Sequence, residues 1–255
     1  MLSKIVPDEF TNFLEIFDDH KRARNLLFDW IQLRKGKMTV DSINNPTVAL
    51  YTFSQMGFIA GDSSSENAIP LIKTILPLTI IIPPDSDWGN LIRKQWGKRT
   101  QTLRRTRMSH ETLDIDFIRQ LKNQLNNECK LEKINLAIIE NSEKTFWSSI
   151  LFFFKSYEDF LENSIGFCVL NNNITVSVAY TAFPFVNDFE IQVMTLDNPE
   201  FRRKGHATVA CAALIENGLS NGMVPHWDAA NPASVKLAEK LGYSNPDPYD
   251  VFYWM

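Results

Sequence analysis

The residues Arg202–Ala207 have the composition of a loop that binds an anion. They follow a β-prone segment and precede a helical one. A loop entering a helix presents free backbone N–H groups at the positive end of the helix dipole. Cationic side chains fill the first half of the loop, and Gly205 has no Cβ to obstruct a ligand. The pattern predicts a phosphate-binding loop, with a solvated basic turn before a helix as the plainer alternative.

The loop differs from two common nucleotide-binding motifs. A Walker loop needs a second glycine and a Lys-Ser/Thr pair, and the dinucleotide fingerprint needs three glycines. Neither pattern occurs around Gly205. The identity of the anion therefore has to come from the elements around the loop.

The second half of the chain alternates strand and helix signals. The clearest is a hairpin, in which two β-prone runs flank the turn Asn171–Asn173. The predicted strands are Leu131–Ile139, Gly166–Leu170, Ile174–Thr181, Phe189–Thr195, Val224–Asp228 and Tyr249–Trp254. The predicted helical segments are Lys144–Glu162, His206–Leu219 and Asn231–Leu241, the last of them capped at or near Asn231.

The first half mixes the same two signals with less regularity. The predicted helices are Phe10–Arg34, Asp87–Trp96 and Ser109–Asn126, and the predicted strands are Thr47–Phe53 and Leu78–Ile82. We place a domain boundary near residue 128, which gives domains 1–128 and 129–255. The fold class expected for the whole chain is α+β, a mixed α/β arrangement.

The stretch Phe189–Tyr243 resembles the GNAT superfamily of N-acetyltransferases. The matching pieces are the strand Glu190–Thr195, the Arg-x-x-Gly-x-Ala loop at 202–207, Asn231–Ser234 and Leu237–Tyr243. Gly166–Leu170 and Ala229–Asn231 resemble one two-domain branch, similar to the zwittermicin-resistance acetyltransferases. The resemblance implies a C-terminal GNAT fold, with a central, mostly antiparallel, splayed sheet flanked by helices. It also implies a divergent α/β N-terminal companion domain, for which a GNAT-like fold is one option.

The resemblance further implies acetyl-CoA as co-substrate and a set of residues that hold it. Strand backbone would bind the pantetheine arm and polarise the thioester oxygen, and loop amides would bind the pyrophosphate. Asn231 matches a position whose side chain contacts the pantetheine arm. The implied acetyl-CoA-binding residues are Val193, Met194, Thr195, Arg202, Arg203, Lys204, Gly205, His206, Ala207, Thr208, Asn231 and Ser234.

Glu190 is the candidate general base. An ammonium must lose a proton before it attacks a thioester, and a carboxylate at the start of this strand can take the proton directly or through water. Strand alternation places Glu190, Gln192 and Met194 on one face. The alternative interpretation is that the Glu190 carboxylate is exposed to solvent or binds the substrate.

One position departs from the family pattern. Many members carry a tyrosine in the last helix that protonates the leaving thiolate, and Ala238 stands there in this chain. Either the thiolate leaves unprotonated, or another group replaces the tyrosine; Tyr180, His226 and Tyr243 are the candidates, which the sequence does not rank. His226–Asp228 could line a substrate site at the end of a strand, but the favoured interpretation is that Trp227 packs between domains and His226 is an ordinary polar neighbour.

Composition limits the remaining options. The chain has 255 residues, 44% of them hydrophobic and 22% charged, with a formal net charge of -4. An acidic balance argues against a dedicated nucleic-acid binder, although basic residues gather between 93 and 107. Cys129, Cys168 and Cys211 have no metal-binding spacing and fit a reducing compartment. We expect no metal, no membrane span and a cytoplasmic location.

The function that these patterns favour is transfer of the acetyl group of acetyl-CoA directly to a primary amine of a small molecule. The alternative is a non-catalytic acyl-CoA-binding or sensing module, which the missing tyrosine suggests. A nucleic-acid-associated role for residues 93–107 is weaker. The acceptor amine and the oligomeric state stay open, a dimer included.

Overall fold

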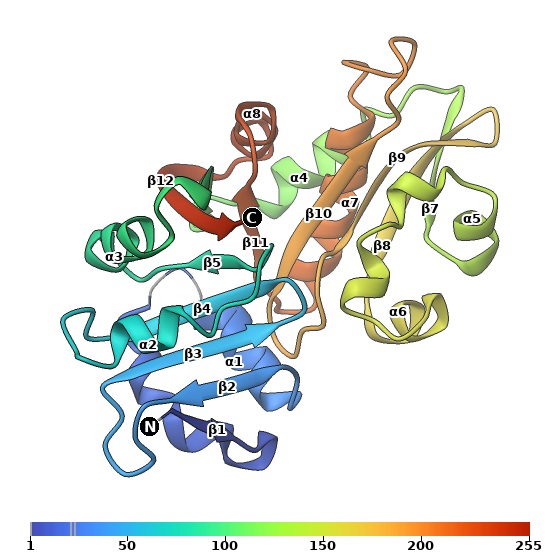
Figure 1. Cartoon of the computed structure of the whole chain (residues 1–255). Helices are drawn as coiled ribbons and strands as arrows, with labels where there is room; N and C mark the ends of the chain where they lie inside the picture. The colour runs from blue at the N-terminus through green and yellow to red at the C-terminus, as the bar shows by residue number, and fades with distance from the viewer. Residues whose placement is uncertain (1, 21, 23) are drawn as a thin grey trace. The chain divides into compact units, whose positions relative to one another are not determined.

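The computed structural model describes residues 2–20, 22 and 24–255. The chain forms two compact units. Unit 1 comprises Met1–Arg105 and Pro248–Met255, and unit 2 comprises Thr106–Asp247. Figure 1 shows the helices and strands of each unit along the chain.

Unit 1 is built on a sheet whose first strands are antiparallel neighbours. Its strands in spatial order are β1 (Ser3–Ile5), β2 (Lys37–Val40), β3 (Val48–Phe53), β4 (Met56–Gly61), β5 (Ile80–Ile82) and, from Pro248 on, β12 (Ser244–Trp254). β5 runs parallel to β4, and β12 runs antiparallel to β5. The helices are η1 (Pro7–Phe13), η2 (Glu15–Phe17), α1 (Arg24–Gln32), α2 (Ala68–Ile72), α3 (Ser86–Trp96) and η3 (Gly97–Arg99). Trp88 and Phe252 belong to a buried core that includes strands β3 and β4.

Unit 2 has the same pattern of pairing. Its strands in spatial order are β7 (Cys129–Lys133), β8 (Gly166–Asn171), β9 (Ile174–Thr181), β10 (Phe189–Thr195), β11 (Pro225–Ala229) and, from Thr106 on, β6 (Thr100–Ser109). The first four are antiparallel neighbours, β11 is parallel to β10, and β6 is antiparallel to β11. The helices are α4 (Ile115–Lys122), α5 (Leu136–Glu140), η4 (Lys144–Phe146), η5 (Ile150–Phe152), α6 (Tyr157–Asn163), α7 (His206–Ser220) and α8 (Pro232–Lys240).

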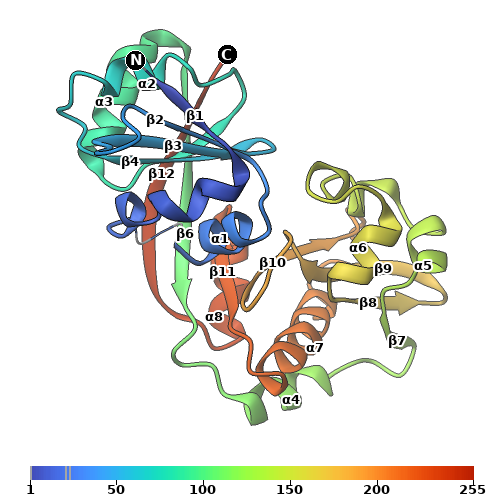
Figure 2. The same ribbon diagram turned by 90° about the horizontal axis from the view of Figure 1, so that it is seen from below.

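Helices cover both faces of the sheet in unit 2. Figure 2 shows α4 and α7 on one side of β8–β10, and α5 and α6 on the other. The core on the α7 side includes Phe189 and Trp227, and the core on the other side includes Phe146 and Tyr180. The mixed α/β fold with a mostly antiparallel, helix-flanked sheet, which the sequence predicted, is confirmed.

In each unit the last strand comes from a distant part of the sequence. β6 follows α3 of unit 1 along the chain, yet Thr106–Met108 pair with β11. β12 follows α8 of unit 2, yet Phe252 pairs with Ile81 of β5. Each sheet is therefore completed by a strand that the sequence places after the helices of the other unit.

Most predicted elements of the second half are confirmed. The hairpin is β8 and β9, and its turn residues Asn172 and Asn173 adopt positive φ angles of 49° and 64°. β10 spans Phe189–Thr195 as predicted, and α7 begins at His206. In the first half, Thr47–Phe53 is β3 and Asp87–Trp96 is α3.

The strand predicted over Leu131–Ile139 is wrong beyond Lys133. Asn135 ends the extended segment, because its side chain accepts a hydrogen bond from the Ile138 amide at 3.0 Å and starts α5. The apolar alternation at Ile134, Leu136 and Ile138 therefore belongs to a strand end and a short helix.

Three predicted helices are shorter than expected. Ser109–Asn126 is helical only over α4, since Ser109 ends β6 and Asp114 caps the helix through the Phe117 amide at 2.7 Å. Lys144–Glu162 breaks into η4, η5 and α6. Phe10–Arg34 breaks into η1, η2 and α1, and residues 21 and 23 lie outside the described part of the chain.

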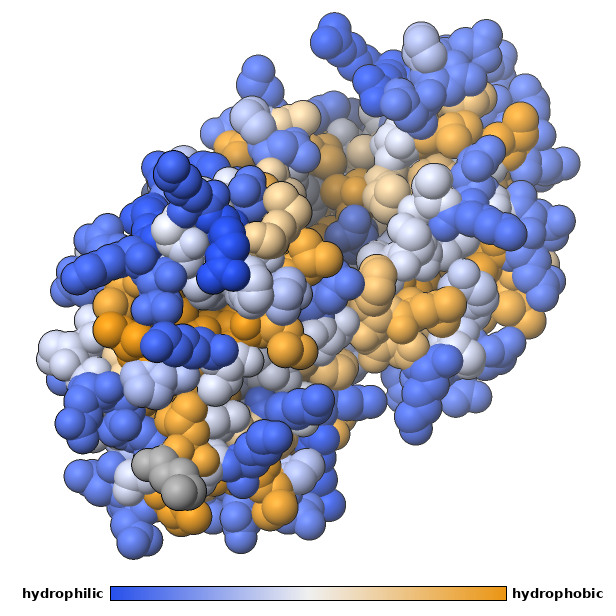
Figure 3. Space-filling view, in the orientation of Figure 1, coloured by the Kyte–Doolittle hydropathy of each residue, from blue (hydrophilic) through white to orange (hydrophobic). Residues whose placement is uncertain are grey.

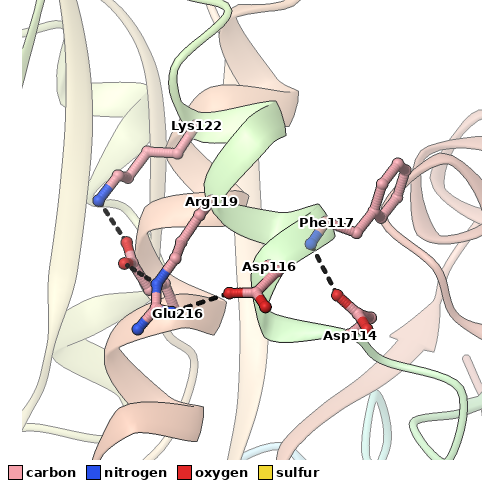
Figure 4. A network of polar contacts seen from close by, with 6 residues as sticks. All are labelled: Asp114, Asp116, Phe117, Arg119, Lys122 and Glu216. Carbon is pink, nitrogen blue, oxygen red and sulfur yellow. Dashed lines mark hydrogen bonds and ion pairs between the residues drawn. The ribbon is translucent and has the colours of Figure 1, made fainter.

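Ion pairs join α4 to α7. Arg119 Nε lies 3.1 Å from Glu216 Oε1, and Lys122 Nζ bonds to the other oxygen of Glu216 (Figure 4). Arg119 also pairs with Asp116 at 3.0 Å. These contacts, together with Ile118 and Leu121 in the core, attach α4 to unit 2.

Residue 128, where the sequence predicts a boundary, lies inside unit 2 just before β7. Residues 106–128 belong to this unit because β6 pairs with β11 and α4 packs on α7. The roles expected for 1–128 as companion domain and 129–255 as catalytic domain stay a prediction.

Candidate functional site

β10 and β11 separate immediately after Glu190. They pair only at Phe189–Pro225 and Glu190–His226, whereas β10 stays paired with β9 as far as Thr195. Beyond His226, β11 pairs with β6 on its other side. Among the described residues, no strand covers the edge of β10 that faces the gap, so its backbone groups there can bind a ligand.

The register of β9 and β10 shows which backbone groups face this gap. The Glu190 carbonyl accepts from the Ala182 amide at 2.8 Å, and the Leu196 amide donates to the Val176 carbonyl at 2.9 Å. In an antiparallel pair the hydrogen-bonding residues alternate. The backbone of Val193 and Thr195 therefore points into the gap, whereas that of Met194 points towards β9.

The predicted anion loop leads from β10 to the N-terminus of α7. Arg203 and Gly205 adopt left-handed φ angles of 61° and 84°, and Gly205 caps α7 without a side-chain hydrogen bond. Within the described residues, the amides from Gly205 to Thr208 have no protein acceptor. An ideal Cβ on Gly205 would meet nothing within 4 Å. Free amides and open space are what an oxyanion needs at a helix N-terminus.

The side chains of this loop have different environments. Arg202 pairs with Asp197 at 2.6 Å, while Arg203 and Lys204 are exposed. His206 is buried, and its Nε2 lies 3.6 Å from the Sγ of Cys129. Burial, and secondarily the charge of Lys204, lowers the pKa of His206, so this imidazole is neutral at pH 7. The positive charge near the anion site comes from arginine, lysine and the helix dipole.

Asn231 and Ser234 both shape the start of α8. Asn231 Oδ1 accepts from the Ser234 amide at 3.0 Å, which caps the helix. Ser234 Oγ accepts from Nε1 of Trp227 at 3.1 Å. Trp227 is 2% exposed and lies in the core of unit 2, so its role is packing.

Glu190 lies in a row of polar side chains that crosses three strands. Its Oε1 is 3.3 Å from Nη1 of Arg107 on β6. Register places Glu190 opposite His226 and Arg107 opposite Asp228. Residues two apart on a strand share a face, so these four side chains lie on one side of the sheet.

His226 is a neutral member of this row. Its Nε2 lies 3.5 Å from Oδ2 of Asp188, and its ring meets the ring of His110 edge-on with centroids 5.2 Å apart. Burial, and secondarily the positive charge of Arg107, lowers the pKa of His226 to about 4. At pH 7 the imidazole therefore carries no proton to donate as an imidazolium.

The two candidate tyrosines are already engaged. Tyr180 donates to the Phe146 carbonyl at 2.9 Å, and burial raises its pKa to about 12. Tyr243 donates to the Pro225 carbonyl at 2.8 Å, and burial holds its pKa well above the ordinary value. Ala238 is fully buried in α8. Both hydroxyl protons are therefore already used in hydrogen bonds and are poorly placed to protonate a leaving thiolate.

The aromatic run between residues 146 and 154 divides between core and surface. Phe146, Trp147 and Phe154 are buried, whereas Phe152 is 50% exposed. Leu151 beside it is 54% exposed, and Figure 3 shows apolar residues gathered on the surface of unit 2 near α6. Most of the run therefore belongs to the core.

Arg107, His110 and Asp188 were not among the predicted site residues. Arg107 belongs to the basic stretch between residues 93 and 107, and 83 positions separate it from Glu190. Its neighbours Arg93 and Arg104 both pair with Asp250 in unit 1. No sequence signal distinguishes the arginine that reaches the carboxylate from those that do not.

The described residues contain neither a metal-binding cluster nor a membrane-spanning helix. No cluster of His, Cys, Asp or Glu there could hold a metal ion. No helix in that part of the chain is long and apolar enough to cross a membrane. The three cysteines are all free and buried.

Comparison with known proteins agrees with this geometry. A model of the family described as GNAT acetyltransferase matches residues 15–252. YdfB of Bacillus subtilis (strain 168), described as an uncharacterized N-acetyltransferase, is 26% identical over 267 residues, which cover 99% of this chain and 98% of YdfB.

Solved structures share the fold over the whole chain. A GCN5-related N-acetyltransferase-like protein from Streptococcus suis 89/1591 has a TM-score of 0.80 at 24% identity, with 98% of this chain and 100% of that chain covered. A tandem GNAT protein from the clavulanic acid biosynthesis pathway has a TM-score of 0.59 at 12% identity, with 99% and 97% covered. Because the family model spans nearly all of the sequence, this protein belongs to the GNAT acetyltransferase family.

Proposed function

We propose that this acetyltransferase transfers the acetyl group of acetyl-CoA directly to a primary amine of a small molecule. The observation that carries the proposal is the separation of β10 from β11 directly after Glu190. It places the Glu190 carboxylate where the gap between the two strands begins. Beyond that point, the edge of β10 that faces the gap is not paired with β11. The loop Arg202–Ala207 follows the far end of the same strand.

The two ends of this gap match the two ends of acetyl-CoA. The amides from Arg203 to Thr208 would hold the pyrophosphate, with Arg202, Arg203 and Lys204 supplying charge. The backbone of Val193 and Thr195 would pair with the pantetheine amides, as an added strand does. Met194 lies between them, and Asn231 and Ser234 stand at the start of α8 across the gap.

Glu190 would act as general base at the closed end. The neutral amine attacks the thioester carbonyl, so that a C–N bond forms and the C–S bond breaks with its electron pair on sulfur. The amine proton passes to the Glu190 carboxylate, directly or through one water. A thiol pKa of roughly 8.5 lets the sulfur leave as thiolate. Departure of an unprotonated thiolate agrees with the alanine at position 238. It also agrees with the hydrogen bonds that Tyr180 and Tyr243 already donate to backbone carbonyls.

The N-terminal unit would be a GNAT-like companion without an acetyl-CoA site. It repeats the pairing order of unit 2, including the parallel step between β4 and β5. Its counterpart of the anion loop, Gly61–Asn67, carries Asp62 and Glu66 and no lysine or arginine. Carboxylates there would repel a pyrophosphate. We therefore propose one acetyl-CoA site per chain.

The location and the branch of the family belong to the same proposal. Three free, buried cysteines agree with a reducing compartment, hence with the cytoplasm. Gly166–Leu170, which suggested the branch similar to the zwittermicin-resistance acetyltransferases, forms most of β8. Membership of that branch stays a prediction.

Thiol release from acetyl-CoA tests the proposal. The chain is incubated with amino acids, polyamines, aminoglycosides and amino-sugar antibiotics, and free CoA is followed with a thiol reagent. Glu190→Gln should lower kcat about 10²- to 10⁴-fold with little change in acetyl-CoA binding. Glu239→Gln, at an exposed position on α8, is the matched control and should keep full activity.

Two results would contradict the proposal in different ways. Acetyl-CoA binding without thiol release for any acceptor would favour an acyl-CoA-binding or sensing module. Full activity of Glu190→Gln would leave the transferase assignment standing and remove Glu190 as the base.

A further inference from the structure

Arg107 reaches Glu190 across an intervening strand. β11 lies between β6 and β10, since it pairs antiparallel with β6 and parallel with β10. Arg107 stands opposite Asp228 of β11, while Glu190 stands opposite His226. The guanidinium therefore extends over the face of β11 to end 3.3 Å from the carboxylate.

Both partners of this ion pair are largely withdrawn from water. The side chain of Arg107 is 22% exposed and that of Glu190 is 10% exposed. By contrast, Arg104 on the same strand is 64% exposed where it meets Asp250. Charges that water screens poorly interact more strongly, so the Arg107 pair has more influence on its carboxylate than the exposed pair has.

The charged and titratable groups around Glu190 come from several elements. They are Arg107 on β6, His110 just after β6, Asp188 just before β10, His226 and Asp228 on β11, and Tyr243 after α8. Arg107 is the permanent cation among them, and burial keeps His226 neutral at pH 7. Burial and nearby carboxylates each favour the protonated form of a carboxyl group. The arginine opposes that tendency.

We propose that Arg107 is a positioning residue for acetyl transfer, which holds the Glu190 carboxylate at the fork between β10 and β11 and keeps it ionised to accept the proton of the amine. This inference rests on the base role of Glu190 proposed above. Arg107 forms and breaks no covalent bond in the reaction. The strand β6 thus brings a residue from before the predicted boundary to the reacting end of unit 2.

The pH dependence of kcat/KM tests this role. Its acid limb reports the protonation of the free enzyme's base. Arg107→Gln should move that limb to higher pH by about one unit or more, because an opposite charge at this range lowers a carboxyl pKa by about 1 to 3 units. Arg107→Lys keeps the charge, so its acid limb should stay in place while kcat falls. Arg104→Gln is the matched control on the same strand and should change neither.

A double variant tests whether Arg107 affects the acid limb through Glu190 or through His226. In the Glu190→Gln background, adding Arg107→Gln should cause no further shift of the acid limb and no further loss of kcat. A further shift of the same size there would overturn the proposal and assign the effect to His226. An unmoved acid limb in Arg107→Gln alone would overturn it as well.

A carboxyl titration tests the inference without any acceptor. In the full chain labelled with ¹³C in glutamate carboxyl groups, the signal lost in Glu190→Gln identifies Glu190 by NMR. Its titration midpoint should rise in Arg107→Gln and not in Arg104→Gln. If the unaltered chain releases no thiol with any amine, the proposed function fails, yet this midpoint still decides whether Arg107 keeps the carboxylate ionised. Equal midpoints in the two variants would overturn the inference.

Discussion

The hydroxyl of Tyr243 donates a hydrogen bond to the backbone carbonyl of Pro225 at 2.8 Å, inside the core of unit 2. Pro225 is the first residue of β11 and stands opposite Phe189 in the pairing with β10. The tyrosine therefore fixes the strand at the point just before the fork. Because the Tyr243 hydroxyl donates its proton to this hydrogen bond, it is poorly placed to protonate a leaving thiolate.

Tyr243→Phe should consequently cost stability more than catalysis. Loss of the hydroxyl leaves the buried Pro225 carbonyl without this donor, at a cost of about 1 to 3 kcal/mol in the free energy of unfolding. Urea unfolding measures this, and kcat should stay within about twofold once unfolded protein is discounted. A loss of kcat of about 10²-fold or more at unchanged KM would instead identify Tyr243 as the general acid.

Gly205→Ala should weaken acetyl-CoA binding beyond its effect on stability. Gly222 is a matched control, because it also has a positive φ (73° against 84°) and also has no atom within 4 Å of an added Cβ. Either alanine costs about 1 kcal/mol of folding free energy from the left-handed backbone. Only the Cβ at position 205 would meet the pyrophosphate, so binding should fall about tenfold or more in that variant alone.

Isothermal titration of acetyl-CoA measures this difference. Equal affinities in Gly205→Ala and Gly222→Ala would speak against the pyrophosphate site at the start of α7. The same titration of the unaltered chain should give one site per chain, as the acidic loop of unit 1 predicts.

Asn231 allows the helix cap and the contact with acetyl-CoA to be tested apart. Asn231→Ala removes the cap of α8 and should lower the free energy of unfolding by about 1 kcal/mol. Asn231→Asp keeps an oxygen for the Ser234 amide but has no amide donor for the pantetheine arm. The aspartate variant should therefore fold as well as the parent and bind acetyl-CoA more weakly. Undiminished binding in that variant would confine Asn231 to the cap.

Glu216 should make stability depend on pH through its contacts with α4. The hydrogen bond from Lys122, and then that from Arg119, lowers the pKa of Glu216 in the folded state. A lowered folded-state pKa means that the stabilisation is fully present above the unfolded-state pKa and disappears as the pH falls through the folded value. Glu216→Gln should thus be less stable than the parent by about 1 kcal/mol at pH 7 and equally stable near pH 2.

Urea unfolding of both proteins across this pH range checks the effect. Asp8→Asn is the control, because Asp8 pairs with Arg34 where both side chains are at least 70% exposed, and water screens such a pair. A gap between parent and Glu216→Gln that did not close at low pH would show that the lost charge is not its cause.

The sequence by itself determined the local features of this protein. The turn at Asn172 and Asn173, the start of α7 after Gly205 and the cap at Asn231 follow from backbone preferences and short-range hydrogen bonds, which act within a few residues. The sequence also indicated the acetyltransferase family, because the strand Glu190–Thr195, the loop at 202–207 and the segment from Asn231 resemble members of that family. It failed at Asn135, where a cap interrupts an alternation that otherwise predicts a strand.

Only the tertiary structure decided which distant residues meet. Pairing of β6 with β11 brings Arg107 to Glu190, and pairing of β12 with β5 returns the end of the chain to unit 1. The fork between β10 and β11 likewise arises because β11 pairs with different strands at its two ends. Strands pair through backbone hydrogen bonds, which do not depend on the side chain. The amino-acid sequence alone therefore says little about which strands pair with each other.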